Sequence, residues 1–189
     1  MFNAFFLKIA ASHFQNFVEK WYIMVMRNLL FYNEILEVTM EFITATVNHL
    51  PAIVRLLADD ELGATRERFE HPLPKAYIDA FAKIEQQIGN SIIVALDNNE
   101  VIGCLQLTII PGIARLGMTR GQIEGVRIDS DYRGKGVGEA LFRYAIHEAR
   151  AMGCGMIQLT TDKKRKDAHR FYERLGFVAS HDGMKLLLD

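Results

Sequence analysis

One segment constrains the fold of this chain more than any other: a predicted strand that runs into a glycine-rich turn and then into a long amphipathic helix. The strand is expected over residues 122–128, and the turn holds Gly134, Gly136 and Gly138. Beyond the turn, apolar residues from Val137 to Met152 recur at helical spacing and mark one face of a helix. A strand followed directly by a helix predicts an α/β domain.

The segments on either side of this unit continue the alternation of strands and helices. The expected strands cover 41–47, 91–96, 101–110 and 156–161, and the expected helices cover 48–57 (capped by Asn48), 75–87 and 168–175. Asp97 to Glu100 predicts a hairpin turn, and residues 178–180 and 184–188 predict a second hairpin around Asp182-Gly183. A chain of 189 residues, half of them apolar, is expected to form one domain, over residues 40–189.

The first 39 residues form an extension of unusual composition. They hold nine of the chain's aromatic residues, Trp21 among them, but Lys8, Glu19 and Arg27 break every run short of the ~18 residues that a membrane span needs. Three interpretations stay open: an extra helix packed on the domain or on a second subunit, an amphipathic helix at a membrane interface, and translation that begins at Met40. We favour the last, because the pattern after Met40 is complete by itself.

Charge and cysteine usage exclude several classes of partner. The formal net charge is −1 and acidic and basic residues are interleaved, so we expect no general attraction to nucleic acid or to anionic lipid, and no stable membrane insertion. Cys104 and Cys154 match neither a metal-ligand spacing nor a disulfide framework. The sequence therefore predicts two reduced, buried thiols in a cytoplasmic protein without a metal site.

The glycine-rich turn itself predicts a binding site for a pyrophosphate. Glycines allow positive φ and close approach of a ligand, and the N–H groups at the start of the helix attract anions. A Walker loop would need Ser or Thr after Lys135, where this chain has Gly136. A dinucleotide fingerprint would need a glycine where Glu139 or Leu141 stands. Both nucleotide motifs therefore fail on spacing.

The turn fits R-x-x-G-x-G instead, formed by Arg133, Gly136 and Gly138. This motif resembles the coenzyme A signature of the GNAT superfamily of N-acetyltransferases. Residues 168–177, with the sequence AHRFYERLGF, resemble the late motif of the same family. The chain departs from the family pattern at Arg165, because members often carry Asn three residues before the alanine of this motif.

The resemblance covers about residues 40–189 and is strongest from 123 to 177. It implies a mixed, mostly antiparallel central sheet that is splayed in the middle and flanked by helices. It also implies acetyl-CoA as co-substrate, with its pantetheine arm paired along the strand and its pyrophosphate held by the turn. The coenzyme-binding residues implied are Val126, Arg127, Ile128, Arg133, Gly134, Lys135, Gly136, Val137, Gly138 and Glu139.

Acetyl transfer to an amine sets chemical demands that two side chains meet. An alkylammonium with a pKa near ~10 must lose a proton before it attacks, and Glu124 is our candidate base, directly or through water. Alternation along the strand predicts that Glu124 shares a face with Val126 and Ile128. The N–H of Val126 is the candidate donor to the oxyanion, and Tyr172, which the resemblance implies near the sulfur, is the candidate acid for the leaving thiolate.

Each of these assignments has a structural alternative. Tyr172 is also placed to be a core aromatic residue beside Phe171, and Glu124 to pair with Arg115, Arg120 or Arg127. The basic run 163–166 is either a solvated face or a contact for the 3′-phosphate of the coenzyme.

The acceptor is the least constrained part of the prediction. The loops at 59–77 and 111–121 carry mixed charge, which favours a polar, zwitterionic small molecule or a peptide N-terminus. A different class of function also stays open, a non-catalytic module that binds coenzyme A as a sensor or assembly component. The sequence does not decide between nitrogen and oxygen acceptors, between acetyl and longer acyl groups, or between a monomer and a homodimer.

Overall fold

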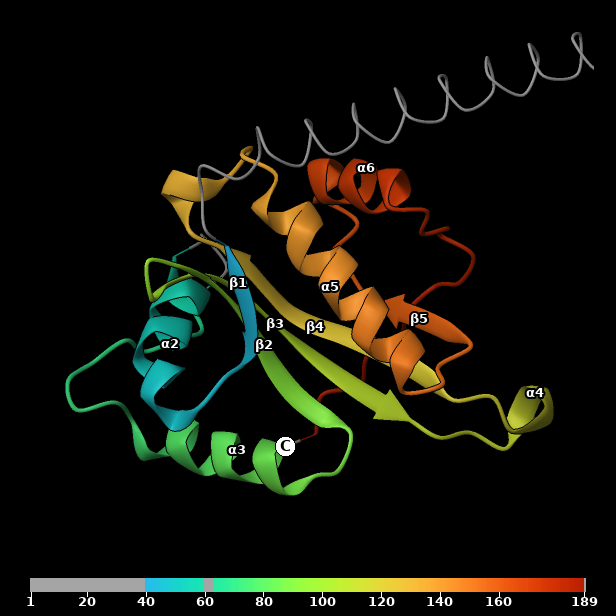
Figure 1. Ribbon diagram of the computed structural model, residues 1–189, viewed down its shortest axis with the longest axis horizontal. Helices are drawn as coiled ribbons and strands as arrows, with labels where there is room; N and C mark the ends of the chain where they lie inside the picture. Colours follow the sequence, from blue (N-terminus) through green and yellow to red (C-terminus); the bar gives the residue numbers. More distant parts are fainter. Residues whose placement is uncertain (1–39, 60–62, 189) are drawn as a thin grey trace, which may run out of the picture. The chain divides into compact units, whose positions relative to one another are not determined.

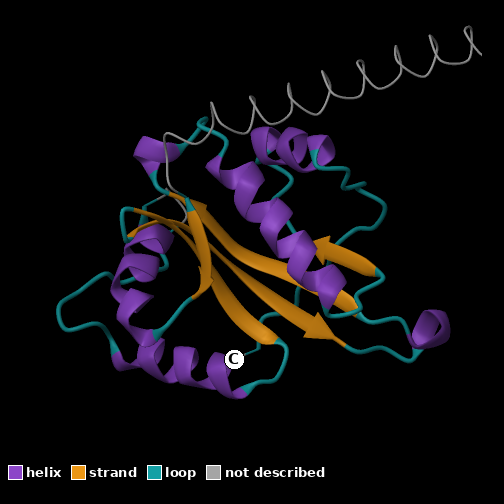
Figure 2. Ribbon diagram, in the orientation of Figure 1, coloured by secondary structure: helices purple, strands orange, loops and turns teal. Residues whose placement is uncertain are grey.

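The computed structural model of the protein describes residues 40–59 and 63–188 (Figure 1). The predicted extension over residues 1–39 lies outside the described residues. The rest is built on one mixed sheet with helices packed against it (Figure 2), as the sequence predicts.

The sheet has five strands in the order β1-β2-β3-β4-β5. They are β1 (Glu41–Thr44), β2 (Asn90–Asp97), β3 (Glu100–Ile110), β4 (Arg120–Ile128) and β5 (Met156–Leu159). The first three pairings are antiparallel, and only β5 runs parallel to its neighbour β4. The parallel pair is joined through α5, the crossover helix that such a connection requires. The mostly antiparallel sheet is therefore confirmed.

The helices and turns follow the predicted order. They are η1 (Val47–His49), α2 (Leu50–Ala58), α3 (Lys75–Gln86), α4 (Ala114–Gly117), η2 (Ser130–Tyr132), α5 (Val137–Ala151) and α6 (Lys166–Arg174). The expected role of Asn48 as a helix cap is wrong, because a short 3-10 turn precedes α2. Thr46 caps that turn, and the Nδ1 of His49 accepts a hydrogen bond from the Thr46 backbone N–H at 3.0 Å.

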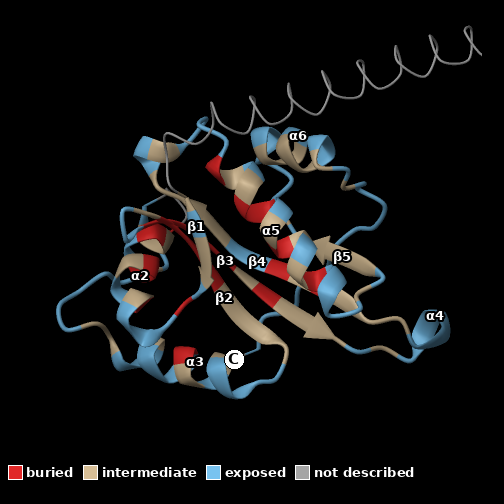
Figure 3. Ribbon diagram, in the orientation of Figure 1, coloured by how far each residue is buried: buried red, intermediate tan, exposed pale blue. Residues whose placement is uncertain are grey.

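Apolar side chains on the two faces of the sheet form the core. One cluster unites α2 and α3 with the sheet and includes Val54, Phe81, Val94 and Cys104. On the other face α5 lies across β3 and β4, and its buried residues turn toward the sheet (Figure 3). Phe142 of α5 is fully buried. Its ring contacts three aromatic rings from α6 and the residues beyond it: Phe171, Tyr172 and Phe177.

Two turns have the backbone that their residues favour. Asn98 and Asn99 have φ of 48° and 65°, the left-handed pair that joins β2 to β3 as a tight hairpin. Gly176 has φ of 91° just after α6, as a left-handed helix end requires. Local residue preference is sufficient to predict both turns.

The second predicted hairpin, around Asp182-Gly183, is wrong. Residues 178–180 and 184–188 form no strand, and Val178, Met184 and Leu186 to Leu188 are largely exposed. An isolated pair of such short strands is marginal without further pairing. The described contact of the turn is an exposed ion pair between Lys163 Nζ and Asp182 Oδ1, at 3.1 Å, which adds little stability.

Candidate active site

The sheet opens between β4 and β5. The two strands pair from Arg120↔Met156 to Ile123↔Leu159, where β5 ends. β4 continues to Ile128 and stays paired with β3 on its other side. The last five residues of β4 therefore face a gap instead of a neighbouring strand, which is the splay that the resemblance implies.

A bulge in β4 lies at this gap. Glu124 pairs with Gln106 and Arg127 pairs with Cys104, so that Gly125 and Val126 together oppose the single residue between them on β3. Gly125 takes φ of 61°, a left-handed value that glycine adopts without strain. The extra residue shifts the alternation of side chains beyond it by one position.

This shift corrects the expectation that Glu124 shares a face with Val126 and Ile128. The register places Glu124 on the face of Gln106 and Cys104, the side of α2 and α3. Ile128 pairs with Gly103 and lies on the opposite face, next to Gly138 of α5. A strand without the bulge would have put Glu124 and Ile128 on the same side, so the error comes from assuming strict alternation.

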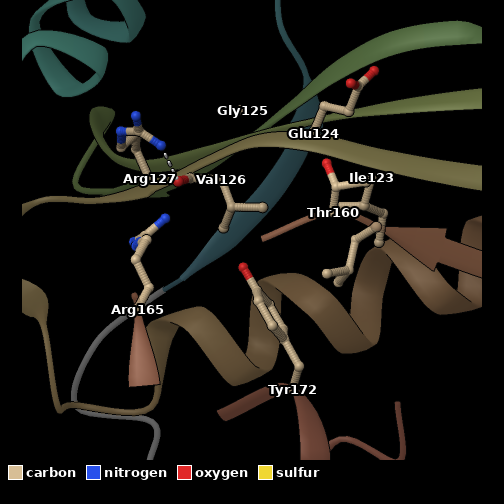
Figure 4. Close-up of a pocket in the computed structure, with 9 residues that line it drawn as sticks. Ile123, Glu124, Gly125, Val126, Arg127, Thr160, Arg165 and Tyr172 are labelled. Carbon is tan, nitrogen blue, oxygen red and sulfur yellow. Dashed lines mark hydrogen bonds between the residues drawn. The ribbon is translucent and has the colours of Figure 1, made fainter. Parts of the chain in front are cut away.

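A small cleft of about 100 Å³ opens at the gap. It is lined by Ile123, Glu124, Gly125, Val126, Arg127, Leu159, Thr160, Arg165 and Tyr172. Figure 4 shows Glu124 and Arg127 pointing to one side of β4, while Val126 points to the other, toward Tyr172 and Arg165. The structure thus brings the predicted base and the predicted acid to one cleft, from opposite sides of the strand.

Tyr172 combines a packed ring with a hydroxyl directed at the cleft. Its ring centroid lies 5.5 Å from that of Phe142 and 5.4 Å from that of Phe171, so the core alternative describes the ring correctly. The hydroxyl forms no hydrogen bond with any described residue and points toward β4 (Figure 4). Burial raises the pKa of Tyr172 above its usual value, and Arg165 and Arg127 act in the opposite direction. The group is therefore protonated at neutral pH and able to donate a proton.

Glu124 is exposed at the mouth of the cleft. Among the residues that the structure describes, it forms no ion pair, and in particular none with Arg115, Arg120 or Arg127. The alternative of a structural ion pair is thus not supported. Its carboxylate is accessible to an acceptor from the α2 and α3 side of the sheet.

The glycine-rich turn leads from β4 into α5 and has an open concave surface. Gly134 and Gly136 have φ of 76° and 83°, and a Cβ on either would meet no atom within 4 Å. Gly136 is the N-cap of the 15-residue helix α5, whose first N–H groups have no acceptor within the helix. These amides and the helix dipole suit an anionic group that approaches the backbone closely. The turn therefore fits the pyrophosphate of acetyl-CoA.

Gly138 faces packed side chains rather than the open surface. A Cβ at this position would lie 3.6 Å from both Ile128 and Phe171, an ordinary van der Waals distance, so packing does not by itself require a glycine here. Glu139 forms an ion pair with Arg143 at 2.6 Å, one turn further along the helix. That pairing offsets the negative charge that Glu139 brings to the anion site.

Arg133 is held at the edge of the turn by two contacts. Its Nε donates to the carbonyl of Ile128 at 3.0 Å, and its Nη2 lies 3.0 Å from Oδ2 of Asp59 at the end of α2. Lys135 lies over the ring of Tyr132, with its Nζ 5.4 Å from the centroid. Both cations border the turn, as the motif requires, but Asp59 is a partner that the sequence did not predict.

The cleft also includes two polar residues that were not among the predicted site residues, Arg165 and Thr160. Arg165 points into the cleft beside Tyr172 (Figure 4), and its departure from the usual Asn was the signal for it. Thr160 follows β5 and begins the segment 160–165, which the departure at Arg165 made a less certain contact for the coenzyme. Over the described part of the chain, no helix has the length and apolar character that crossing a membrane requires.

Comparison with known proteins agrees with this geometry. The sequence model of the Acetyltransferase (GNAT) family matches residues 52–177. Glucosamine 6-phosphate N-acetyltransferase of Trypanosoma brucei brucei is 29% identical over 140 residues, which are 70% of this chain and 93% of that protein. Aminoalkylphosphonate N-acetyltransferase of Salmonella typhimurium is 34% identical over 107 residues, which are 57% of this chain and 69% of that protein.

A solved structure gives the same fold over the same region. The crystal structure of a Bacillus halodurans C-125 protein, described as a transcriptional regulator, is 48% identical and superposes with a TM-score of 0.77. The match covers 79% of this chain and 99% of that one. The chain thus belongs to the Acetyltransferase (GNAT) family and is an acetyl-CoA-dependent acyltransferase.

Proposed function

We propose that the protein transfers the acetyl group directly from acetyl-CoA to the primary amine of a small polar acceptor, with both substrates bound at once. The observation that carries this proposal is the position of Glu124 and Tyr172 on opposite sides of β4 at one cleft. The names of the two relatives, which refer to an amino sugar phosphate and to aminoalkylphosphonates, support a small amine as acceptor.

Glu124 takes the proton from the acceptor ammonium, directly or through one water. Its carboxylate is exposed on the α2 and α3 side, where it forms no ion pair with a described residue. The neutral amine then forms its bond to the acetyl carbon from that side. A carboxylate in this position converts the ammonium into a nucleophilic amine by general-base catalysis, and no covalent bond between the acetyl group and the enzyme is needed.

The bulge supplies the donor for the negative charge that develops on the acetyl oxygen. The pairing with β3 is interrupted at Gly125 and Val126, at the floor of the cleft. The backbone N–H of Val126 is the group that we assign to this oxygen. A fixed backbone donor of this kind stabilises the transition state more than the ground state.

Tyr172 gives its proton to the sulfur as the carbon–sulfur bond breaks. The hydroxyl faces the cleft and is protonated at neutral pH, as an ordinary tyrosine is, and burial raises its pKa further. Arg165 adds a positive charge on the same side, which favours a developing thiolate. The ammonium nitrogen loses two protons in all. The first goes to Glu124, and the second leaves the nitrogen as the amide forms and returns to Tyr172, which has given its own proton to the sulfur. Glu124 then releases its proton to water, so the step yields the amide, free coenzyme A and one proton.

Steady-state kinetics with variants test the proposal. Thiol release from acetyl-CoA with a small primary amine should fall by about 10²- to 10⁴-fold in Glu124→Gln and by a smaller factor in Tyr172→Phe. Both variants should keep the thermal stabilisation by acetyl-CoA. Glu85→Gln on α3 and Tyr144→Phe on α5, whose ring stacks on Phe42 of β1 outside the cleft, are the matched controls and should retain full turnover.

The order of events has its own test. Direct transfer predicts initial-velocity lines that intersect when both substrates are varied. Parallel lines, or an acetylated enzyme found by mass spectrometry, would contradict it. Full turnover in Glu124→Gln would remove that residue from the mechanism.

A further inference from the structure

A straight row of polar side chains crosses the sheet beside Glu124. β2, β3, β4 and β5 each contribute one residue, and the register pairs Asn90 with Thr108, Thr108 with Gln122, and Gln122 with Gln158. We call these four residues the polar row. Each is partly exposed, and three of them lie on the interior strands β2, β3 and β4, where apolar residues predominate.

Hydrogen bonds hold the side chains of the polar row in place. Nε2 of Gln158 donates to Oε1 of Gln122 at 2.7 Å, and Oγ1 of Thr108 donates to Oδ1 of Asn90 at 3.0 Å. Gln106, one register step toward the bulge, donates to the same oxygen of Asn90 at 3.0 Å. The side chains are thus ordered before any ligand arrives, which lowers the entropy cost of binding.

The polar row lies on the same face as Glu124. Residues 120 to 124 of β4 pair with β3 without a bulge, so Arg120, Gln122 and Glu124 alternate onto one face of the sheet. This is the face of Cys104, where the α2 and α3 cluster covers the opposite ends of β2 and β3. The row therefore extends the acceptor side of the cleft.

Two cations stand on the side of the polar row opposite to Glu124. Arg120 pairs with Met156 across β4 and β5, and Nη1 of Arg115 lies 3.9 Å from Sδ of the same methionine. Neither arginine forms an ion pair with a residue that the structure describes. The face thus carries a carboxylate at one end, amides and a hydroxyl in the middle, and guanidinium groups at the other end.

We infer that the polar row is the floor of the acceptor site, for an amine that carries hydroxyl groups and, at the end remote from the amine, a phosphoryl group. Glu124 receives the amine, Gln122 and Gln158 bond to the hydroxyl groups, and Arg120 with Arg115 binds the phosphoryl oxygens. Uncharged amides suit hydroxyl groups because they both donate and accept. Guanidinium groups suit phosphoryl oxygens because their paired N–H donors match them.

The spacing agrees with an acceptor of sugar size. Cα atoms four residues apart on a strand are separated by about 13 Å, and the long side chains of Glu124 and Arg120 shorten the span between their charged groups. A two-carbon aminophosphonate is too short to use both ends at once. The inference rests on the proposed function, because Glu124 defines where the amine lies.

Three amines test the site: glucosamine 6-phosphate, glucosamine and 2-aminoethylphosphonate. In the wild type, kcat/KM for glucosamine 6-phosphate should exceed that for glucosamine by about ten- to a hundredfold, as expected for hydrogen bonds to a charged group. Arg120→Gln should reduce this ratio to near one through KM. Arg150→Gln, an exposed arginine on α5, is the matched control and should leave the ratio unchanged.

The amide positions have a separate test. Gln122→Leu combined with Gln158→Leu should raise KM for both sugars by a similar factor and have little effect on 2-aminoethylphosphonate. Thermal unfolding checks that each variant folds. Arg120→Lys keeps the positive charge, so its ratio of kcat/KM for glucosamine 6-phosphate to kcat/KM for glucosamine should lie between the ratios of Arg120→Gln and the wild type. An unchanged ratio in Arg120→Gln, or equal rates for both sugars in the wild type, overturns the inference.

Binding without turnover separates this inference from the proposed function. Glucosamine 6-phosphate should raise the unfolding temperature of the wild type in the presence of coenzyme A, and Arg120→Gln should abolish that rise. If no amine supports thiol release but glucosamine 6-phosphate still raises the unfolding temperature through Arg120, the proposed function is wrong and the sugar phosphate site at the polar row is supported. If Glu124→Gln stops turnover but Arg120→Gln binds the sugar phosphate normally, the site fails and the proposed function stands.

Discussion

Gly136 and Gly153 stand at the two ends of α5 with nearly the same backbone conformation. Their φ angles are 83° and 78°, and a Cβ on either would meet no atom within 4 Å. Only Gly136 borders the predicted pyrophosphate site, whereas Gly153 follows the last turn of the helix. The pair therefore separates the effect of backbone strain from the effect of blocking the site.

Alanine at Gly136 should abolish the stabilisation by acetyl-CoA, and alanine at Gly153 should not. Both variants should lose about 1–2 kcal/mol of unfolding free energy, because each forces a non-glycine residue into a left-handed conformation. Acetyl-CoA at ~100 times its dissociation constant should add about 2.7 kcal/mol to the wild type and to Gly153→Ala, a shift of several degrees. If acetyl-CoA shifts the unfolding temperature of Gly136→Ala equally, the pyrophosphate does not bind at this turn.

Removing the carboxylate of Asp59 should strengthen coenzyme binding. Asp59 Oδ2 lies 3.0 Å from Nη2 of Arg133, so it competes with a pyrophosphate for this cation. Both side chains are about half exposed, so the expected gain in Asp59→Asn is only a few-fold in Kd. Asp79→Asn, which removes a carboxylate paired with Lys75 on α3, is the control. Weaker binding in Asp59→Asn, measured by calorimetry, would show instead that the pair orients Arg133 productively.

Neutralising Arg165 should raise the pKa of Tyr172. Burial raises this pKa, and the positive charges of Arg165 and Arg127 lower it. When one of these charges is removed, a smaller part of the increase caused by burial is cancelled. The titration of Tyr172, measured at 295 nm as the difference between matched proteins with and without Tyr172→Phe, should move to higher pH in Arg165→Gln. Lys164→Gln removes a neighbouring charge that does not line the cleft and should have a smaller effect. A shift to lower pH would contradict the assignment.

The two cysteines should differ in reactivity toward a thiol reagent at pH 8. Burial raises the pKa of Cys104 to about 12, so almost none of it is thiolate. Cys154 is only partly buried, which differs from the expectation that both thiols are enclosed. Native protein should therefore react mainly at Cys154, and Cys154→Ser should leave a native protein that reacts only after unfolding. Fast reaction of native Cys154→Ser would show that Cys104 is accessible.

Much of the fold could be predicted because it depends on short stretches of chain. The asparagines at 98 and 99 favour the left-handed turn of the first hairpin, and the apolar stripe of α5 follows from its own spacing. The second hairpin failed because its turn signal was present but its strands found no neighbouring strand to pair with. A turn motif alone does not stabilise a hairpin at the end of a chain.

The strand, the glycine-rich turn and the helix that form the expected coenzyme site could be read from the amino-acid sequence, because glycine conformation and helix periodicity are local properties. Which side chains lie at the candidate active site depends on the folded sheet. The bulge at Gly125 and Val126 separates Glu124 from Ile128, and the polar row forms only when four strands take their register. Register depends on how the whole sheet packs against its helices, which no short segment encodes.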